Sequence, residues 1–390
     1  MKSVTTIRLK IPCKRELLET MKQYSKSAQY VVDTGWDNGT YSKRELHNLT
    51  YYPIREILEL PAQLVCSSRD KACETLKALR KVKKPTKPNF KEMLTIRYDA
   101  RSFGFKFDCV SLVTINGRVK IPIDVPEYYW KYLDWDIRNA DLTFNKNGLF
   151  LNITFSKDIQ LPSNSDGFLG VDVGINQVAV TSNRQFFKAR QIKLKRVKFK
   201  KLRAKLQSKG TRSAKRLLKK VSGREKRFMG YWNHVISKQI VNNCEAGTIV
   251  LENLKGIRKN SKGRRFNFWL NSWSFYQLQQ FITYKALRNG IKTIKVSPYM
   301  TSQTCSKCGK VGSRSKGFFV CSHCGYSLNA DLNASFNLAK HHSISDGVSV
   351  AVTQPNIRVD EHKGSSRTFA CETMDNDDNK SVKPHTLVCG

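Results

Sequence analysis

The chain has 390 residues and carries 69 Lys and Arg against 31 Asp and Glu, which gives a formal net charge of +38. The positive charges repel one another and attract polyanions, which argues against a small-molecule enzyme. Nucleic acid is the indicated partner. A membrane surface is the weaker alternative, because no basic amphipathic anchor stands out. Hydrophobic residues make up 40% of the chain, enough for packed cores, yet no apolar run approaches the ~18 residues of a membrane span and the start of the chain does not resemble a signal peptide.

Strands are predicted at the start of the chain and again after a long helical block. Residues 3–11 alternate between apolar and polar, and the same alternation returns over 94–158. Asn116-Gly117 and Asn147-Gly148 are typical of hairpin turns. One strand before the helical block and several after it are most simply joined as a β-barrel with a helical insertion.

The helical block has apolar residues at helical spacing over 13–80. Turn signals at Gly35 and at Asn38-Gly39 are expected to divide it, and a basic, proline-marked link follows over 81–91.

The second half of the chain has an α/β pattern. Its expected elements are a strand pair from Phe168, a basic helical stretch over 188–227, strands at 248–252 and 291–297, a helix at about 272–289, and a helix from about Asp331. Acids outnumber bases in the last segment, 343–390, which has no periodicity and is expected to be flexible.

The basic stretch holds 19 Lys and Arg and a single acid, Glu225, within residues 188–227. A thin leucine stripe and Gly210 predict a helical hairpin. Unrelieved repulsion between neighbouring cations favours a polyanion partner over a solvated face, and so many cations indicate contact with phosphates, not with bases. The residues predicted to contact nucleic acid are Lys193, Lys195, Arg196, Lys198, Lys200, Lys201, Arg203, Lys205, Arg212, Lys215, Arg216, Lys219, Lys220 and Arg224. Aromatic residues at 266–273 are candidates for base stacking or for the core.

Four of the eleven cysteines form two CxxC pairs. They are Cys305, Cys308, Cys321 and Cys324, and a glycine follows the second cysteine of each pair. This spacing is typical of a structural zinc site with four thiolate ligands and no open position. Chance clustering and a redox pair are the alternatives, and His323 could replace one thiolate.

Three acids stand at the ends of predicted elements. Asp172 lies within an apolar strand, where a carboxylate is costly unless it is paired or binds a cation. Glu252 ends a second strand, and Asp331 begins a helix. Glu252 could instead be a surface acid and Asp331 a helix N-cap. Taken together, the three acids predict a site for two Mg²⁺ ions that hydrolyse a phosphodiester.

The order of these motifs resembles a known family. Gly170-Val-Asp-Val-Gly, Val250-Leu-Glu-Asn-Leu-Lys255, the two CxxC pairs and Asn329-Ala-Asp-Leu-Asn-Ala resemble the RuvC nuclease of the TnpB/OrfB family. These are proteins of IS200/IS605- and IS607-type insertion sequences, related to compact type V CRISPR effectors. The resemblance is dense over 168–340 and only architectural over 1–160. Many members have an acid where this chain has Asn329.

The resemblance implies a transposon-associated, RNA-guided DNA endonuclease that cuts next to a short flanking motif. Asp172, Glu252 and Asp331 would be the catalytic acids. Guide RNA and double-stranded target DNA would be the partners, with two catalytic Mg²⁺ and one structural Zn²⁺, in a prokaryotic cytoplasm near the nucleoid. A silent RNA-guided DNA-binding regulator, a compact type V CRISPR effector and, less favoured, a DNA-strand transferase are alternatives.

The fold class that follows is α/β plus β, an RNase H-like RuvC domain with a zinc-ribbon insertion, preceded by a wedge-type β-barrel that carries a helical recognition insertion. The predicted divisions are wedge barrel 1–12 and 92–160, recognition insertion 13–91, linker 161–167, RuvC 168–304 and 325–342, zinc ribbon 305–324, and tail 343–390.

Overall fold

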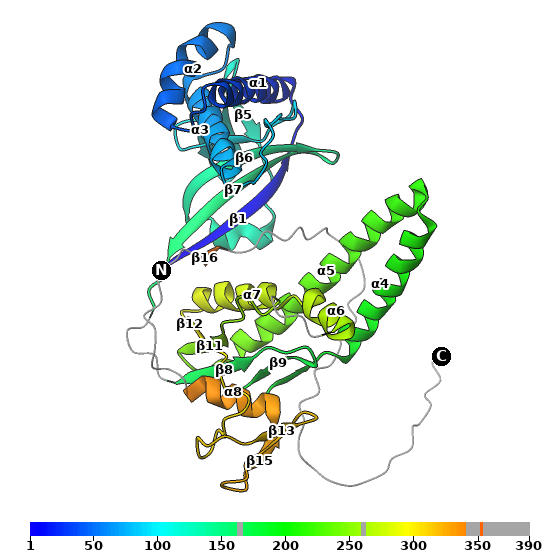
Figure 1. Ribbon diagram of the computed structural model, residues 1–390. Coiled ribbons are helices and arrows are strands. Elements are labelled where there is room, and N and C mark those ends of the chain that lie inside the picture. The colour runs from blue at the N-terminus through cyan, green and yellow to red at the C-terminus, as the bar shows by residue number, and fades with distance from the viewer. Residues whose placement is uncertain (162–166, 259–262, 341–351, 354–390) are drawn as a thin grey trace, which may run out of the picture. The chain divides into compact units, whose positions relative to one another are not determined.

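The computed structural model describes residues 1–161, 167–258, 263–340 and 352–353. The chain divides into two compact units, the first built mainly from the described part of Met1–Ser163 and the second from the described parts of Asn164–Ile282 and Thr293–Asp346 (Figure 1). Most of the predicted linker and of the predicted flexible tail lies outside the described residues. Among the helices of the described ranges, none combines the length and the apolar character needed to cross a membrane.

The first unit contains two sheets that share one hydrophobic core, and their strands pair antiparallel except for the parallel pair of β1 with β16. The five-stranded sheet has the order β16-β1-β7-β6-β2, and the three-stranded sheet has the order β3-β4-β5. Their bounds are β1 Lys2–Ile11, β2 Ile96–Tyr98, β3 Phe103–Phe105, β4 Cys109–Thr114, β5 Gly117–Pro122, β6 Asp136–Asn145, β7 Gly148–Asp158 and β16 Val352–Thr353, with a 3₁₀ helix at Glu127–Tyr132. Both predicted hairpins are confirmed, since Thr114 pairs with Gly117 and Asn145 with Gly148. The described strands pair as two sheets, so a closed barrel is not confirmed.

Three helices form the predicted insertion between β1 and β2. They are α1 Arg15–Asp37, α2 Lys43–Ile57 and α3 Ala62–Leu79. The predicted turn at Gly35 is wrong, because α1 continues through this residue and ends only at Asn38-Gly39. A Cβ at Gly35 would lie 2.6 Å from Leu76 Cδ1, so this glycine serves close packing of α1 on α3.

The second unit is a five-stranded mixed sheet with helices. The strand order is β10-β9-β8-β11-β12, in which β8 and β11 are parallel neighbours. The strands are β8 Phe168–Asp172, β9 Gln177–Thr181, β10 Phe186–Lys188, β11 Thr248–Glu252 and β12 Lys292–Val296; the helices are α4 Arg190–Lys209, α5 Arg212–Asn242, α6 Arg264–Ser272, α7 Phe275–Arg288 and α8 Ala330–Lys340. Helix α6 and strand β10 were not predicted, and α5 continues to Asn242, beyond the predicted end of the basic stretch at 227. The remaining strands and helices of the sheet lie close to their predicted ranges.

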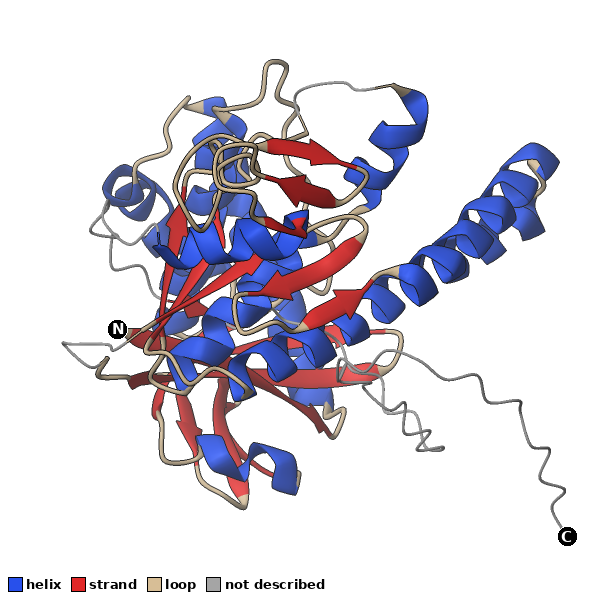
Figure 2. Cartoon of the chain, turned by 90° about the horizontal axis from the view of Figure 1, so that it is seen from below, coloured by secondary structure: helices blue, strands red, loops and turns tan. Residues whose placement is uncertain are grey.

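Helices α4 and α5 form the predicted hairpin, a long antiparallel pair that is easily followed in Figure 2. Gly210 has φ of 63°, a left-handed conformation that ends α4, and the Thr211 side chain caps α5 by accepting from the Ala214 amide. A small cluster of Leu206, Ala214 and Val221 holds the two helices together.

Helix α8 crosses β8 at very short range. A Cβ at Gly170 would lie 2.0 Å from the Ser335 carbonyl oxygen and 2.7 Å from the Ala339 amide nitrogen. Both are backbone atoms, which cannot move aside as a side-chain end can. Only glycine therefore permits this approach, which fixes α8 against the strand that ends at Asp172.

Gly170→Ala is expected to lower the free energy of unfolding of the second unit by about 3 kcal/mol, a loss of roughly 6–12 °C in Tm, because the added methyl group displaces α8. Differential scanning calorimetry measures the change. Gly223→Ala is the matched control: Gly223 lies inside α5, and its Cβ would meet only Arg227 Nη1 at 3.5 Å, so its Tm is expected to hold or rise. Equal Tm values for the two variants would contradict the close crossing.

A small ribbon precedes α8. Its three strands are β13 Ser313–Ser315, β14 Phe318–Val320 and β15 Ser327–Asn329, in this order in one antiparallel sheet. The ribbon therefore extends beyond the predicted end at residue 324 and runs directly into α8.

Candidate active site and metal centre

Asp172 and Glu252 end two parallel neighbouring strands. The register pairs Leu251 with Val171, so the two acids come next on β11 and β8. Paired residues of parallel strands point to the same face of a sheet, and so do residues two apart on one strand. Asp172 therefore shares its face with Gly170, on the side that α8 covers.

Asp331 lies in the first turn of α8. The side chain of Asn329 caps this helix, because its Oδ1 accepts from the amides of Asp331 and Leu332 at 3.0 and 3.1 Å. The reading of Asp331 as the N-cap is therefore wrong. Its carboxylate instead accepts from Arg314 Nη2 at 2.8 Å, a residue of the ribbon strand β13.

Asp172 lies within electrostatic reach of both other acids. Burial, followed by the charges of Glu252 and Asp331, raises the pKa of Asp172 well above its usual value, while Arg314 opposes the rise. Burial also raises the pKa of Glu252, and a hydrogen bond from Thr301 and the charge of Arg314 oppose it. The repulsion of an ionised Asp172 by its two acidic neighbours is the electrostatic situation that a bound divalent cation relieves.

Glu252 is 8% exposed and lies among polar groups from three elements. Thr301 Oγ1 donates to its carboxylate at 2.8 Å, and Gln279 of α7 donates to its backbone carbonyl at 2.7 Å. The Asn253 amide donates to the Val296 carbonyl at 2.7 Å. The alternative reading of Glu252 as a surface acid is therefore wrong.

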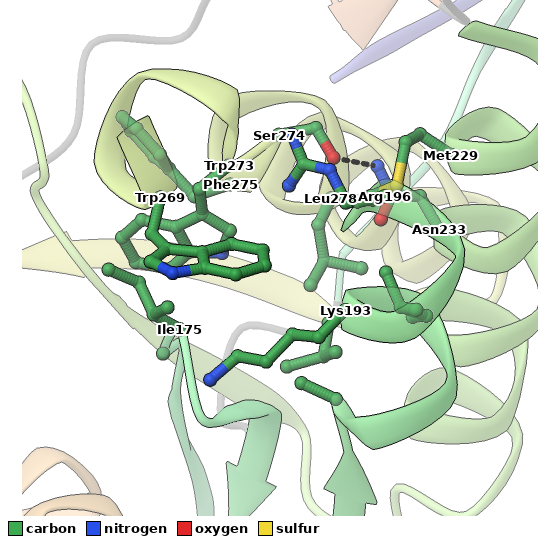
Figure 3. A pocket seen from close by; sticks show the side chains of 14 residues that line it. Ile175, Lys193, Arg196, Met229, Asn233, Trp269, Trp273, Ser274, Phe275 and Leu278 are labelled. Atoms are coloured by element: carbon green, nitrogen blue, oxygen red, sulfur yellow. Dashed lines mark hydrogen bonds between the residues drawn. The ribbon is translucent and has the colours of Figure 1, made fainter. Parts of the chain in front are cut away.

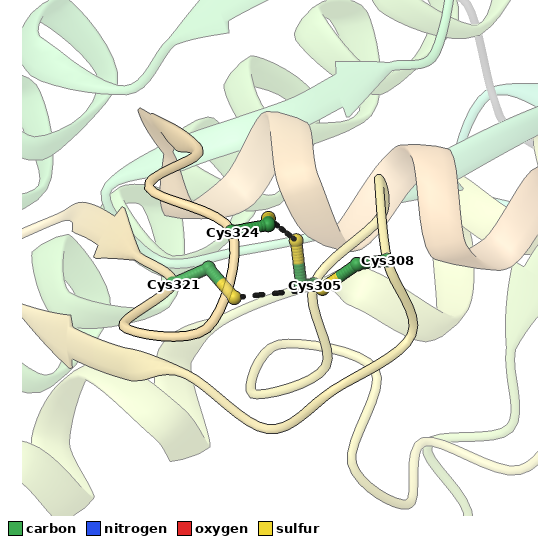
Figure 4. A group of neighbouring side chains, drawn as sticks. All are labelled: Cys305, Cys308, Cys321 and Cys324. Carbon is green, nitrogen blue, oxygen red and sulfur yellow. Dashed lines mark hydrogen bonds between the residues drawn. The ribbon is translucent and has the colours of Figure 1, made fainter.

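The four cysteines converge as predicted (Figure 4). Across the described ranges, they are the one group of three or more His, Cys, Asp or Glu whose ligand atoms gather for a metal, all within 4.8 Å. The Sγ–Sγ separations are 3.7 Å for Cys305–Cys324 and 3.6 Å for Cys308–Cys321. A tetrahedral zinc with Zn–S bonds of about 2.3 Å requires an edge of about 3.8 Å, so the four thiols fit Zn²⁺. The three acids do not form such a compact group.

The electrostatics of this site favour a thiolate. Backbone amides of Cys324 and His323 lower the pKa of Cys321 to about 6. The His323 side chain is exposed, which fits its reading as a surface residue of the ribbon.

The predicted phosphate-contacting residues on the α4–α5 hairpin differ in their exposure. Arg196, at 6% exposed, is buried beside Glu225, and Arg203 pairs with the same carboxylate. Both arginines link the two helices through Glu225, and their predicted contact with nucleic acid stays a prediction. Lys193 is half-buried. The exposed residues are Lys195, Lys198, Lys200, Lys201, Lys205, Arg212, Lys215, Arg216, Lys219, Lys220 and Arg224.

A small pocket lies where α6 and α7 face the start of α4 (Figure 3). Trp269 and Trp273 line it, and Lys193 reaches toward the turn after β8, where its ammonium donates to Asn176 Oδ1 at 2.5 Å. Trp269 and Trp273 are half-buried, while Phe266 is 41% exposed. These aromatic residues mainly pack this part of the unit.

Two polar residues beside the acids were missed from the sequence. Arg314 stands in a strand of only three residues, and Thr301 precedes the cysteines in Thr301-Ser-Gln-Thr-Cys305. Only the place of Thr301 shortly before the first CxxC pair could have drawn attention to it, since no periodicity distinguishes Thr301 or Arg314.

Comparison with known proteins gives two family matches. Residues 153–258 match the OrfB_IS605 model, described as a probable transposase, and residues 275–338 match the TNB domain of Cas12f1-like proteins. The chain thus carries a segment similar to the OrfB_IS605 model, followed by a segment similar to a Cas12f1-like TNB domain.

Individual relatives show the family to which the chain belongs. TnpB-like protein MJ0751 of Methanocaldococcus jannaschii is 30% identical over 259 residues, which cover 61% of this chain and 92% of that protein. The endodeoxyribonuclease Cas12f1 of Sulfoacidibacillus thermotolerans is 44% identical over 112 residues, 28% of this chain, and the chain spans only a quarter of that relative's length. The chain belongs to the TnpB-like family.

Among solved structures, that of the mini-RNA-guided endonuclease CRISPR-Cas_phi3 has a TM-score of 0.53 at 13% identity, covering 87% of this chain and 92% of that one. This likeness concerns the fold.

Proposed function

We propose that this chain is a transposon-associated, RNA-guided DNA endonuclease that hydrolyses target phosphodiesters in a RuvC-type site. The observation that carries the proposal is the placement of three acids. Asp172 and Glu252 end neighbouring parallel strands, and Asp331 stands on the helix that crosses the same face. The family matches and the nuclease names of the relatives support the same activity.

In this proposal Asp172, Glu252 and Asp331 hold two Mg²⁺, which supply activation of a water and stabilisation of the leaving 3′ oxygen when bound. Arg314 donates to Asp331 and orients that carboxylate. Thr301 does the same for Glu252. The guanidinium of Arg314, with its side chain 41% exposed, can also meet a phosphate that enters the site.

Guide RNA and target DNA are the proposed partners. The solved structure of similar fold is named an RNA-guided endonuclease, and one relative of this chain is named an endodeoxyribonuclease. On this chain, the exposed cations of the α4–α5 hairpin offer a surface for the phosphates of a guide–target duplex. The first unit, as the proposed wedge and recognition part, would read the flanking motif.

The test is copurification followed by cleavage. The wild-type chain, expressed with its native flanking DNA, is expected to copurify with one defined RNA and to cut a plasmid matched to the variable end of that RNA, in Mg²⁺ and not in EDTA. An RNA with a repeat-derived end would place the chain with CRISPR effectors. Binding of the matched plasmid without any nicking would favour the silent regulator.

A further inference from the structure

The segment that joins β12 to the ribbon lies between Glu252 and α8. Its first anchor is Thr301, a residue 2% exposed, whose hydroxyl lies 2.8 Å from Glu252 Oε1 and 3.2 Å from the Pro298 carbonyl oxygen. A hydroxyl has one proton to donate, and an ionised carboxylate at the shorter distance is the stronger acceptor. Thr301 therefore fixes one oxygen of a side chain that otherwise has several rotamers.

Two buried asparagines of α8 hold the same segment from the other side. Asn337 Nδ2 donates to the carbonyls of Thr301 and Thr304 at 2.8 and 2.6 Å. Asn333, one helical turn earlier, donates to the Thr304 carbonyl at 2.8 Å and accepts from the Ser306 amide at 2.9 Å. These contacts place the backbone of Thr301 in a fixed relation to α8, the helix that carries Asp331.

A chain of contacts thus joins two of the three acids. Glu252 is held by Thr301, Thr301 is held by Asn337, and Asn337 stands on the helix of Asp331. Because β11 and α8 are far apart in the sequence, the separation of their acids would otherwise depend on packing alone. A metal ion binds tightly only when its ligands are accurately placed, so a contact outside the ligand set that fixes a ligand strengthens metal binding.

We propose that Thr301 is a positioning residue that sets Glu252 for metal binding and couples its place to that of Asp331. The proposal rests on the function proposed above. Thr301 does not touch substrate or reacting atoms, and it acts only through the carboxylate of Glu252. Loss of its hydroxyl leaves Glu252 free to rotate, and the ion is then bound less tightly.

The test compares Thr301→Val, which keeps the shape and removes the hydroxyl, with Thr301→Ser, which keeps the hydroxyl. Mn²⁺ binding to the full-length protein is followed by electron paramagnetic resonance of the free ion, and the site-specific part is the part that Asp172→Ala removes. Thr301→Val is expected to weaken this binding by about 10–100-fold, and Thr301→Ser to remain near wild type. In cleavage, Thr301→Val should need more Mg²⁺ for half-maximal rate, with the maximal rate recovered at high Mg²⁺.

Wild-type Mn²⁺ binding by Thr301→Val would overturn the positioning role. So would a loss of zinc or a lowered Tm in Thr301→Val, since Thr301 would then be a residue of the fold. If Asp172→Ala removes no Mn²⁺ from the wild-type protein, the metal site of the proposed function fails, and that result is separate from any effect of Thr301.

Discussion

Asp172→Ala is expected to abolish cleavage of guide-matched DNA while the binding of RNA and DNA stays close to wild type. Asp172 faces α8 from the end of β8 and lies within the field of both other acids. A lost metal ligand removes several kcal/mol of transition-state stabilisation, so the rate should fall by about 10³-fold or more. The exposed cations of α4 and α5 are untouched, which preserves phosphate binding.

The same substitution is expected to leave stability unchanged or to raise it. The pKa of Asp172 is higher in the folded state than in the unfolded state, so its ionised form disfavours folding. The stability that the protonated Asp172 contributes is complete below the unfolded-state pKa. It is lost as the pH rises through the folded-state pKa. At neutral pH in EDTA, Asp172→Ala should therefore melt no lower than wild type. The matched control is Glu245→Ala, an exposed acid of the same unit, which should keep full cleavage.

Plasmid nicking measures cleavage and filter binding measures nucleic-acid binding, and both assays use the copurified RNA. Retained cutting by Asp172→Ala would refute the RuvC assignment. Loss of cutting together with loss of binding would point to a general defect, and the melting curve would then reveal it.

Cys321→Ser is expected to have the second large effect, loss of both zinc and cleavage. The thiol is buried in the ribbon, and removal of one of four ligands leaves the metal weakly held. Zinc in such sites contributes about 10–16 kcal/mol to local folding. Without it, β13 loses its support, and with it goes the contact of Arg314 with Asp331.

Elemental analysis should find one zinc per chain in wild type and well under one in Cys321→Ser. Limited proteolysis should then cut within 305–329, while the rest of the second unit stays protected. Cys13→Ser changes an exposed thiol and is the matched control, with full zinc and full cleavage expected. A Cys321→Ser protein that keeps stoichiometric zinc would contradict a four-thiolate site.

Local rules explain why so much of the fold was predictable. Alternation along β1 and β7, the Asn-Gly turns and the glycine after α4 each depend on a few neighbouring residues. The spacing of the cysteines likewise predicts their convergence, because a metal imposes one geometry on four ligands.

What the sequence could not predict depends on partners distant in the chain. Gly35 was misread as a turn because the close contact with Leu76 of α3 is not visible locally. Arg196 was counted among free cations because its burial beside Glu225 requires the hairpin to be folded. Arg314 and Thr301 reach acids 17 and 49 residues away, and no periodicity marks either of them.

The cap at the start of α8 has a consequence for descent within this family. Asn329, not Asp331, satisfies the first free amides of the helix, so Asp331 has no part in starting the helix. Asp172 carries a charge that the fold tolerates at a cost. Under the proposed function, a lineage that loses either acid by one substitution would keep its fold and its nucleic-acid contacts. A cutting enzyme would then need no repair of the fold to become a silent DNA-binding descendant.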